Sequence, residues 1–422
     1  MIRPVRGWLA WAAAGDRRRT LSTTTRSTSV HGRSPWLIVG QSAAALAAGI
    51  GVGRFVYTPI LPLMHAQAGL SAELGASLAT ANYIGYLTGA LAGTFVPALV
   101  RSVVVLRGSL VILIATLAMM PVSHDGAVWF GLRLIAGVAS ALIFVIAVSS
   151  ALTRLRGQVQ HLTGWAFGGV GAGIALSGLL VLLLRTATTW QAAWWSCAAL
   201  ATVLAAAAWG LAPVPQPAPT DQAVSADRPR TRRWFWPLFG SYTFEGIGYI
   251  IAGTFLVAAI EQGVPGPVGS GAWILVGLAA LPSSALWAWL AHRWSRPSLL
   301  FAALAIQVVG VALPALLGGV APALISAVLF GGTFMGVSTL ALAIGTHLQG
   351  PRSVSLLTAG YSAGQILGPM LAAPLLQHGY RQALLLGGVV VLAAVLAAIG
   401  VWIRYPQVRA PFPTPLDTPS RP

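Results

Sequence analysis

The sequence contains no lysine, only 8 acidic residues and a single cysteine. All 25 basic residues are therefore arginine, and the formal net charge is +17. Charged residues make up 8% of the chain, against about a quarter in soluble proteins, which excludes an ordinary water-soluble fold. The lone Cys197 excludes an intrachain disulfide and a cysteine-based metal site, and we expect it to be a small core residue.

Apolar residues take the place of charge and make up 56% of the chain. Runs such as 103–122 and 383–403 lack the polar alternation of a membrane barrel, so they predict transmembrane helices. A span needs about 20 residues, and 422 residues accommodate a dozen. The predicted spans are 36–63, 75–98, 102–121, 127–151, 159–183, 190–211, 236–260, 269–291, 298–318, 320–346, 354–376 and 381–404. The fold class is therefore an all-α polytopic membrane protein with twelve transmembrane helices.

The longest polar connection divides these spans six and six. Residues 213–234 are rich in Pro and Arg, and we expect a cytoplasmic linker between six-helix bundles at 35–212 and 235–405. Residues 1–34 are rich in Arg, Ser and Thr, which favours a disordered basic cytoplasmic tail, with a transit peptide as the alternative. Residues 406–422 are expected to form a second cytoplasmic tail.

The arginines are unevenly distributed over this topology. With the N-terminus in the cytoplasm, most of them flank the cytoplasmic ends of spans. Arg185 and Arg381 lie on the outer side of the membrane, and Arg54 and Arg133 lie within spans. Arginine-rich loops are retained in the cytoplasm, so we expect a bacterial inner-membrane protein with both termini inside. Because the arginines do not gather on one helix or face, nucleic-acid binding is not expected.

Two pairs of segments repeat between the halves. GVGRFVYTPIL at 51–61 is similar to GIGYIIAGTFL at 246–256, and IAGVAS at 135–140 is similar to FGGTFM at 330–335. Both pairs occupy the positions that a duplication of six helices predicts. Parallel repeats about an axis along the membrane normal are a known way to build transporters.

Several of these segments also resemble a known family. GIGVGRFVYTPILPLM (49–64), GIGYIIAGTFLV (246–257) and AGYSAGQILGP (359–369), with further segments in spans 2, 5 and 10, resemble the YbfB/YjiJ-type branch of the major facilitator superfamily. The resemblance implies an MFS fold of twelve helices in two pseudo-symmetric halves, which carries small solutes by alternating access. It names no substrate.

Motifs of the wider superfamily are partly present. RLIAGVASA at 133–141 and GWAFGGVGAG at 164–173 are similar to motifs of proton-coupled antiporters, which implies efflux. The loop at 93–101 lacks the Asp and the Gly-Arg-Arg run of the superfamily. The resemblance therefore does not extend to the usual cytoplasmic salt-bridge gate.

Three ionisable residues fall inside the predicted spans. Glu245 lies near the middle of span 7, where desolvation favours the neutral acid, so we expect it to bind and release a proton. Arg54 and Arg133 keep their charge. They would pair with Glu245, attract an anionic substrate group, or remain structural charges that snorkel toward the interface.

Aromatic and amide side chains accompany these residues at helical spacing. The expected shared faces are Tyr242 and Tyr249 with Glu245, Tyr57 with Arg54, Asn82 with Tyr86, and Tyr361 with Gln365. They would line an amphipathic cavity, although tyrosines at this spacing also serve in packing. The small residues and proline expected to pack helices closely or act as hinges are Gly49, Gly53, Gly137, Gly168, Gly173, Gly246, Gly248 and Pro369.

The function favoured by these features is secondary active transport of a small organic solute, with proton-coupled efflux. An uptake carrier for an organic anion and a non-transporting sensor or scaffold are the alternatives. A membrane-embedded enzyme would need clustered carboxylates or histidines at an aqueous boundary, and a transport ATPase would need a P-loop; the sequence offers neither. We expect no metal, no cofactor and no enzymatic activity in a monomer whose partners are its solute, protons and the lipid bilayer.

Overall fold

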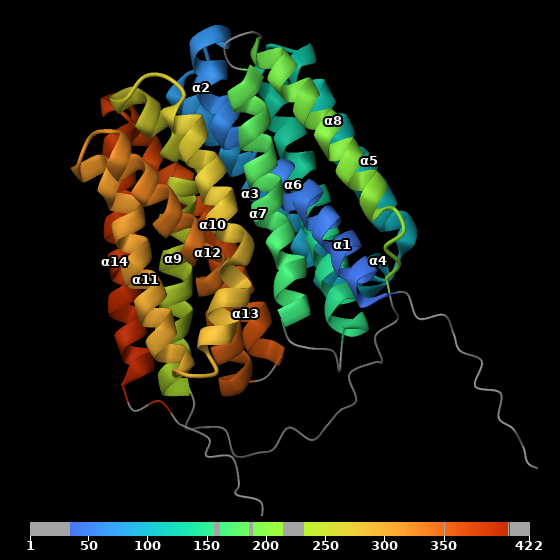
Figure 1. Ribbon diagram of the computed structural model, residues 1–422, viewed down its shortest axis with the longest axis vertical. Coiled ribbons are helices and arrows are strands. Elements are labelled where there is room, and N and C mark those ends of the chain that lie inside the picture. The colour runs from blue at the N-terminus through green and yellow to red at the C-terminus, as the bar shows by residue number, and fades with distance from the viewer. Residues whose placement is uncertain are drawn as a thin grey trace, which may run out of the picture. The chain divides into compact units, whose positions relative to one another are not determined.

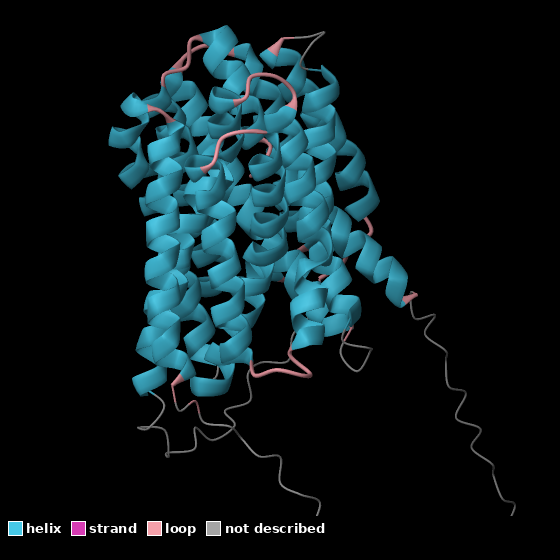
Figure 2. Ribbon diagram, turned by 60° about the vertical axis from the view of Figure 1, so that its left-hand side comes forward, coloured by secondary structure: helices cyan, strands magenta, loops and turns pink. Residues whose placement is uncertain are grey.

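The computed structural model describes residues 34–155, 161–184, 189–213, 232–349, 351–403 and 405, and their regular structure is entirely helical (Figure 2). The predicted tails and most of the predicted linker lie outside these residues. A helix already begins at Arg232, within the last residues of the predicted linker. Trp234 and Phe235 are buried against the end of the last helix, which explains why the helix starts this early.

The first half of the chain contains the helices α1 (Pro35–Leu46), α2 (Tyr57–Ala68), α3 (Ala72–Phe95), α4 (Pro97–Val100), α5 (Val103–Met119), α6 (Gly126–Arg154), α7 (His161–Leu184) and α8 (Trp190–Ala208). Side-chain caps begin several of them after short loops. Ser71, Ser102 and Thr189 accept from the amide three residues on, and Asp125 Oδ1 accepts from Ala127 and Val128 at 2.6 and 3.2 Å.

The second half contains α9 (Arg232–Gly263), α10 (Val268–Leu290), α11 (Arg296–Leu316), α12 (Val320–Gln349), α13 (Pro351–Ala372) and α14 (Tyr380–Trp402). Short 3₁₀ segments, Met120–Val122 and Ala373–His378, follow α5 and α13. In Figure 1, α9 to α14 form one side of the bundle, and the lower ends of α1 and α14 lie at the same end of it. Cys197 is buried and free, as its predicted core role requires.

Ten helical segments of the described chain are long and apolar enough to cross a membrane. The two other predicted spans correspond to α3 and α13, which are long enough at 24 and 22 residues but carry more Gly, Ser, Thr and amide side chains. These two helices pack on each other between the halves. Their polar composition therefore belongs to an internal interface, and the count of twelve spans stays a prediction.

The same helix neighbours recur in both halves. In the first half α3 packs on α6, α5 on α8, and α1 on α7; in the second half α10 packs on α12, α11 on α14, and α9 on α13. The most extensive contacts between the halves join α7 with α10 and α3 with α13, and α2 also packs on α9. The recurring neighbours agree with the duplication predicted from the repeated segments.

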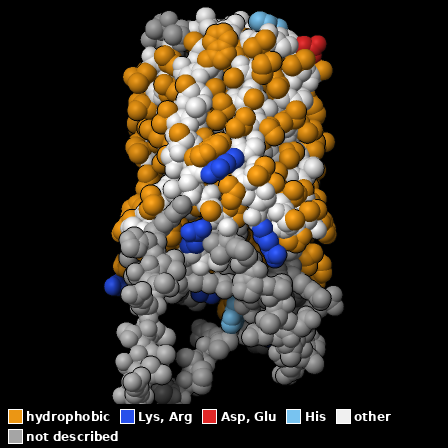
Figure 3. All heavy atoms as spheres, turned by 90° about the vertical axis from the view of Figure 1, so that its right-hand side faces the viewer, with side chains coloured by type: hydrophobic (Ala, Val, Ile, Leu, Met, Phe, Trp, Pro, Cys, Tyr) orange, Lys and Arg blue, Asp and Glu red, His pale blue; other side chains and the backbone are white. Residues whose placement is uncertain are grey.

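The flank of the bundle is apolar over most of its height (Figure 3). On this face arginine side chains lie from mid-height to one end, and an acidic side chain lies at the opposite end. An apolar belt between polar ends is what a lipid environment requires.

The predicted span at 36–63 lies within one segment, Pro35–Ala68, that is long and apolar enough to cross a membrane, but its α-helix is interrupted in the middle. The chain leaves α1 at Leu46, forms a π-helix at Ala47–Val52, and runs through turns at 53–56 before α2 begins. The amides of Gly53 and Phe55 bond carbonyls five residues back, on Ala48 and Ile50, at 2.8 and 3.2 Å.

Pro59 provides a physical reason for this break. It has no amide hydrogen for the Phe55 carbonyl, which accepts from the Thr58 amide at 3.2 Å instead. Thr58 is then no longer available to the Arg54 carbonyl four residues back. In a membrane such a released carbonyl needs another protein donor.

Candidate functional site

Arg133 of α6 supplies the donors that the broken segment lacks. Its Nη1 donates to the Gly53 carbonyl at 3.3 Å and its Nη2 to the Arg54 carbonyl at 3.2 Å. The guanidinium lies 4.9 Å from the Tyr57 ring centroid, and Asn82 Nδ2 donates to the Arg133 carbonyl at 3.0 Å. Arg133 is only 2% exposed. It therefore holds the non-helical turn of the first span in place.

The turn presents Arg54 to a cluster of aromatic rings. The guanidinium carbon lies 4.4 Å from the ring centroid of Tyr86, 4.8 Å from that of Tyr83 and 5.4 Å from that of Phe55. Arg54 is 5% exposed, and its Nε and Nη2 are buried without a hydrogen-bond partner. The site thus contains a buried cation, enclosed by aromatic rings, whose Nε and Nη2 have no hydrogen-bond partner among the described residues.

The second half faces this cation with stacked rings. The run consists of Tyr242, Tyr361, Tyr249, Phe334 and Phe330, whose neighbouring planes differ by 6° to 21°. Phe55 meets Phe334 edge-on at 6.2 Å, which joins the two sets of rings. We refer to Arg54, its three rings and this run as the aromatic cluster.

Hydrogen bonds connect the halves beside the aromatic cluster. The Tyr83 hydroxyl lies 2.9 Å from Thr254 Oγ1, and the Thr58 hydroxyl donates to the Gly253 carbonyl. On the side of the second half, Gln365 Nε2 donates to the Tyr249 hydroxyl at 2.7 Å. Span 1, α3, α9 and α13 therefore meet at the aromatic cluster.

Glu245 is buried between α9 and α11, one helical turn from Tyr242 and Tyr249 of the aromatic cluster. It is fully buried, and Gln307 Nε2 donates to its Oε1 at 3.1 Å. Glu245 Oε2 and Gln307 Oε1 are both buried without a partner. A proton on Oε2 would convert one of these two acceptors into a donor for the other.

Comparison with known proteins places this geometry in a family. A family model described as "Uncharacterised MFS-type transporter YbfB" matches residues 46–399. The chain belongs to this family. Among solved structures, this transporter resembles a mutant of the nucleoside transporter NupG with a TM-score of 0.67 and 14% identity, over 86% of this chain and 100% of that one. At this identity the likeness shows the MFS fold alone. A search of curated proteins finds no match.

In this MFS transporter the predicted pairings of the arginines are partly wrong. Arg54 and Arg133 do not snorkel, because both are buried, and within the described residues neither forms an ion pair with Glu245. Tyr57 lies against Arg133 and donates to the Gly75 carbonyl at 2.9 Å, so it does not share a face with Arg54. A π-helix at Ala47–Val52 and turns at 53–56 interrupt the regular α-helix here, so the spacing assumed for an uninterrupted α-helix does not apply.

The other predicted groups of aromatic and amide side chains come together only in part. Asn82 supports Arg133 while Tyr86 covers Arg54, although both lie on α3. Tyr242 and Tyr249 stack on Tyr361 within the aromatic cluster, whereas Glu245 accepts a hydrogen bond from Gln307. The pair Tyr361 and Gln365 does come together around Tyr249.

Sequence reasoning missed Gln307, Thr254 and the phenylalanine pair of α12. Gln307 is the only amide in span 9, and a polar residue within an apolar run is a signal that could have found it. Phe330 and Phe334 lie in a repeated segment but gave no signal, because phenylalanine is common in membrane helices.

The predicted packing glycines lie at close helix contacts. A Cβ added at Gly49, Gly53, Gly168, Gly173, Gly246 or Gly248 would come within 2.5 to 2.8 Å of a neighbouring atom, and one at Gly137 would clash with the Asn82 carbonyl. Pro369 lies inside α13 near its end, just before the 3₁₀ segment. Packing is the role that these contacts support, and a hinge role stays a prediction.

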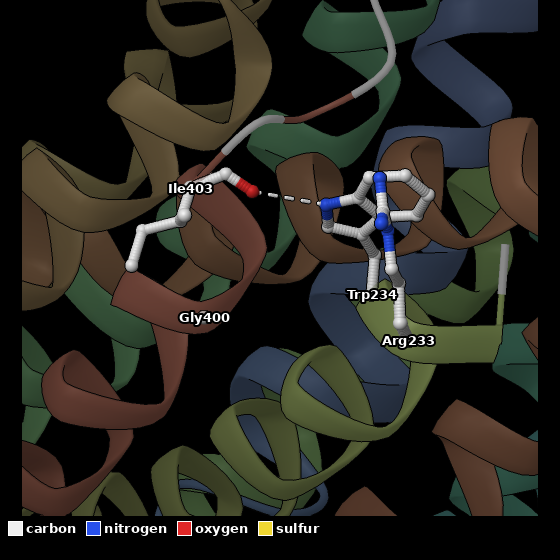
Figure 4. Close-up of a pocket in the computed structure, with 4 residues that line it drawn as sticks. All are labelled: Arg233, Trp234, Gly400 and Ile403. Atoms are coloured by element: carbon white, nitrogen blue, oxygen red, sulfur yellow. Dashed lines mark hydrogen bonds between the residues drawn. The ribbon is translucent and has the colours of Figure 1, made fainter. Parts of the chain in front are cut away.

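A small pocket lies away from this site, where α9 begins and α14 ends (Figure 4). Arg233 covers the Trp234 ring at 3.8 Å, and Trp234 Nε1 donates to the Ile403 carbonyl at 3.1 Å. None of its residues belongs to the aromatic cluster. No group of three His, Cys, Asp or Glu side chains that could hold a metal is found in the described part of the chain.

Proposed function

We propose that this protein is a proton-coupled secondary transporter that exports a small organic solute across the bacterial cytoplasmic membrane by alternating access. The observation that carries the proton coupling is the Glu245–Gln307 pair. A buried carboxyl with one accepted hydrogen bond and one unpartnered oxygen is suited to carry a proton. The antiporter-like segments at 133–141 and 164–173 support the direction of export.

Protonation at Glu245 would alter the contact between α9 and α11. With the proton on Oε2, the acid and the Gln307 amide can form two complementary hydrogen bonds. Without it, two acceptor oxygens remain unpaired in a dry site, which costs about 1–3 kcal/mol per group. α9 also carries Thr254 and Gly253, which bond to the other half. Loss of the proton is therefore proposed to favour rearrangement of the helix that joins the halves.

The topology belongs to the same proposal. The arginine distribution supports cytoplasmic N- and C-termini, and the chain is proposed to act as a monomer. An uptake carrier for an organic anion is the second candidate, favoured by the caged cation Arg54. NupG is named as a nucleoside transporter, so nucleosides belong in the solute panel.

The test is transport by purified protein in proteoliposomes with an imposed pH gradient. We expect Glu245→Gln to lose gradient-driven transport while solute exchange without a gradient persists. Glutamine cannot deliver a proton, but its amide can still pair with Gln307, so folding is expected to survive. Glu73→Gln, at an exposed position in the first turn of α3, is the matched control and should transport normally.

The outcomes separate the candidates. Unchanged gradient dependence in Glu245→Gln would remove this residue from the coupling mechanism. Accumulation of solute on the alkaline side of the membrane would favour uptake by symport over export. Binding of a solute without any transport by the native protein would favour a sensor.

A further inference from the structure

The charge of Arg54 is not balanced by the protein around it. Arg133 is a second buried cation, and Glu245 is engaged by Gln307 rather than by either arginine. No carboxylate contacts Arg54 within the described residues. Removal of an unpaired ion from water costs several kcal/mol, so a counter-charge from outside the chain would stabilise this arrangement.

The free donors of Arg54 have a defined geometry. Nε and Nη2 are the unpartnered nitrogens, and their hydrogens project from the same edge of the guanidinium plane. Two parallel donors at one edge match the two oxygens of a carboxylate. The backbone that carries them is fixed, because Arg133 binds the carbonyls of Gly53 and Arg54 itself.

The surroundings of this edge are aromatic rather than aqueous. Tyr83 and Tyr86 lie against the guanidinium from the first half. Tyr249 and Phe334 present near-parallel rings from the second half, 5.9 Å apart with planes differing by 6°. Such rings favour a flat apolar group that stacks with them. A flat group and a carboxylate on one molecule would satisfy both sets of contacts.

We propose that Arg54 binds the carboxylate of a planar aromatic monocarboxylate, whose ring stacks in the aromatic cluster. This assignment rests on the proposed transport function, since it names the class of solute that the transporter would carry. Arg133 is a positioning residue in this site. The phosphate of a nucleotide is disfavoured, because it brings more negative charge than the single free edge neutralises.

The first experiment uses the native full-length chain in lipid nanodiscs. Binding is measured by calorimetry with benzoate, benzamide, cyclohexanecarboxylate and inorganic phosphate at constant ionic strength. We expect benzoate to bind at least about 10-fold more tightly than benzamide, which lacks the charge. Cyclohexanecarboxylate should bind about 2- to 10-fold more weakly than benzoate, because it cannot stack. Equal binding of benzoate and benzamide, or tighter binding of phosphate, would overturn the proposal.

The second experiment changes the cation. Arg54→Gln should weaken benzoate binding by about 10- to 100-fold and leave benzamide binding unchanged. Arg54→Lys should recover part of the loss, because it keeps the charge without the fork. Arg107→Gln is the matched control, since Arg107 also covers an aromatic ring, that of Trp209 at 5.0 Å, outside this site. Should Arg54→Gln fail to fold, the comparison of benzoate with benzamide on the native protein decides alone.

Failure of this inference and failure of the proposed function give different results. Glu245→Gln should bind benzoate as the native protein does, because the carboxylate site does not include Glu245. Loss of proton coupling in that variant without benzoate binding by the native protein would leave the function intact and refute the anion site. Benzoate binding by a native protein that transports no solute would support the anion site and refute the proposed transport function.

Discussion

Spans 1 and 7 occupy equivalent places in the two halves but differ in backbone and in charge. Span 1 is interrupted by a π-helix and turns, whereas α9 continues unbroken from Arg232 to Gly263. The repeated segments align Arg54 with Tyr249. The first half thus places a cation where the second half places a tyrosine hydroxyl, and the two side chains meet in the aromatic cluster.

The difference separates two tasks that a coupled transporter needs. The buried arginines belong to the first half and the buried acid to the second. Because Glu245 bonds to Gln307 rather than to Arg54, the proposed proton site and the proposed solute site do not share a pair of atoms. Coupling between them would have to pass through α9, which contacts both sites.

The largest loss of stability is expected from replacing the residue that fixes the break in span 1. Arg133→Met removes the donors to the Gly53 and Arg54 carbonyls, so we expect the free energy of unfolding to fall by about 2–4 kcal/mol. Thermal and denaturant unfolding in detergent measure it. Arg107→Met, which loses a bond to the Trp209 carbonyl, should cost about 1 kcal/mol or less. Equal losses would show that the break does not depend on Arg133.

An intermediate effect is expected from paired glycines of the two halves. Gly137 of α6 lies against the Asn82 carbonyl, whereas its repeat partner Gly332 has no atom within 4 Å of an added Cβ. Gly137→Ala should therefore cost about 1–3 kcal/mol of stability. Gly332→Ala should be neutral or stabilise by up to about 1 kcal/mol, since alanine favours a helix.

The same unfolding measurements decide this pair. Gly131→Ala, on the same helix as Gly137 and with open space around it, controls for the change in helix propensity. A loss at Gly332 as large as that at Gly137 would contradict the asymmetry between the halves.

The smallest effect is expected at the bond between the halves. Tyr83→Phe keeps the ring against Arg54 but removes the bond to Thr254, which is worth about 1 kcal/mol. The population of the present conformation relative to alternative conformations should fall about 5-fold, and amide hydrogen exchange in α3 and around Thr254 of α9 should become faster accordingly. Thr88→Val, at an exposed site of the same helix bonding only to Ile84, should leave exchange unchanged. No change in Tyr83→Phe would mean that this bond does not hold the halves together.

The sequence predicted the fold class and the family because these depend on composition and on position along the chain. Apolar runs identified the ten helices long and apolar enough to span a membrane, and the segments around Gly51 and Gly246 indicated the repeat. It also selected the buried ionisable residues correctly, since charge in an apolar run is conspicuous. The partners of these residues were predicted poorly. Regular helical spacing was assumed for Arg54 and Tyr57, and the Pro59 break removed it.

The sequence by itself determined that this chain is a membrane transporter of the major facilitator superfamily, because hydropathy and family motifs are properties of order and composition. Only the tertiary structure decided that Arg133 binds backbone while Arg54 is free, and that Glu245 faces Gln307. The physical reason is that a buried polar atom takes the nearest available partner in space. That partner lies on another helix, 62 residues away for Glu245 and 79 to 80 for Arg133, and no local pattern specifies it.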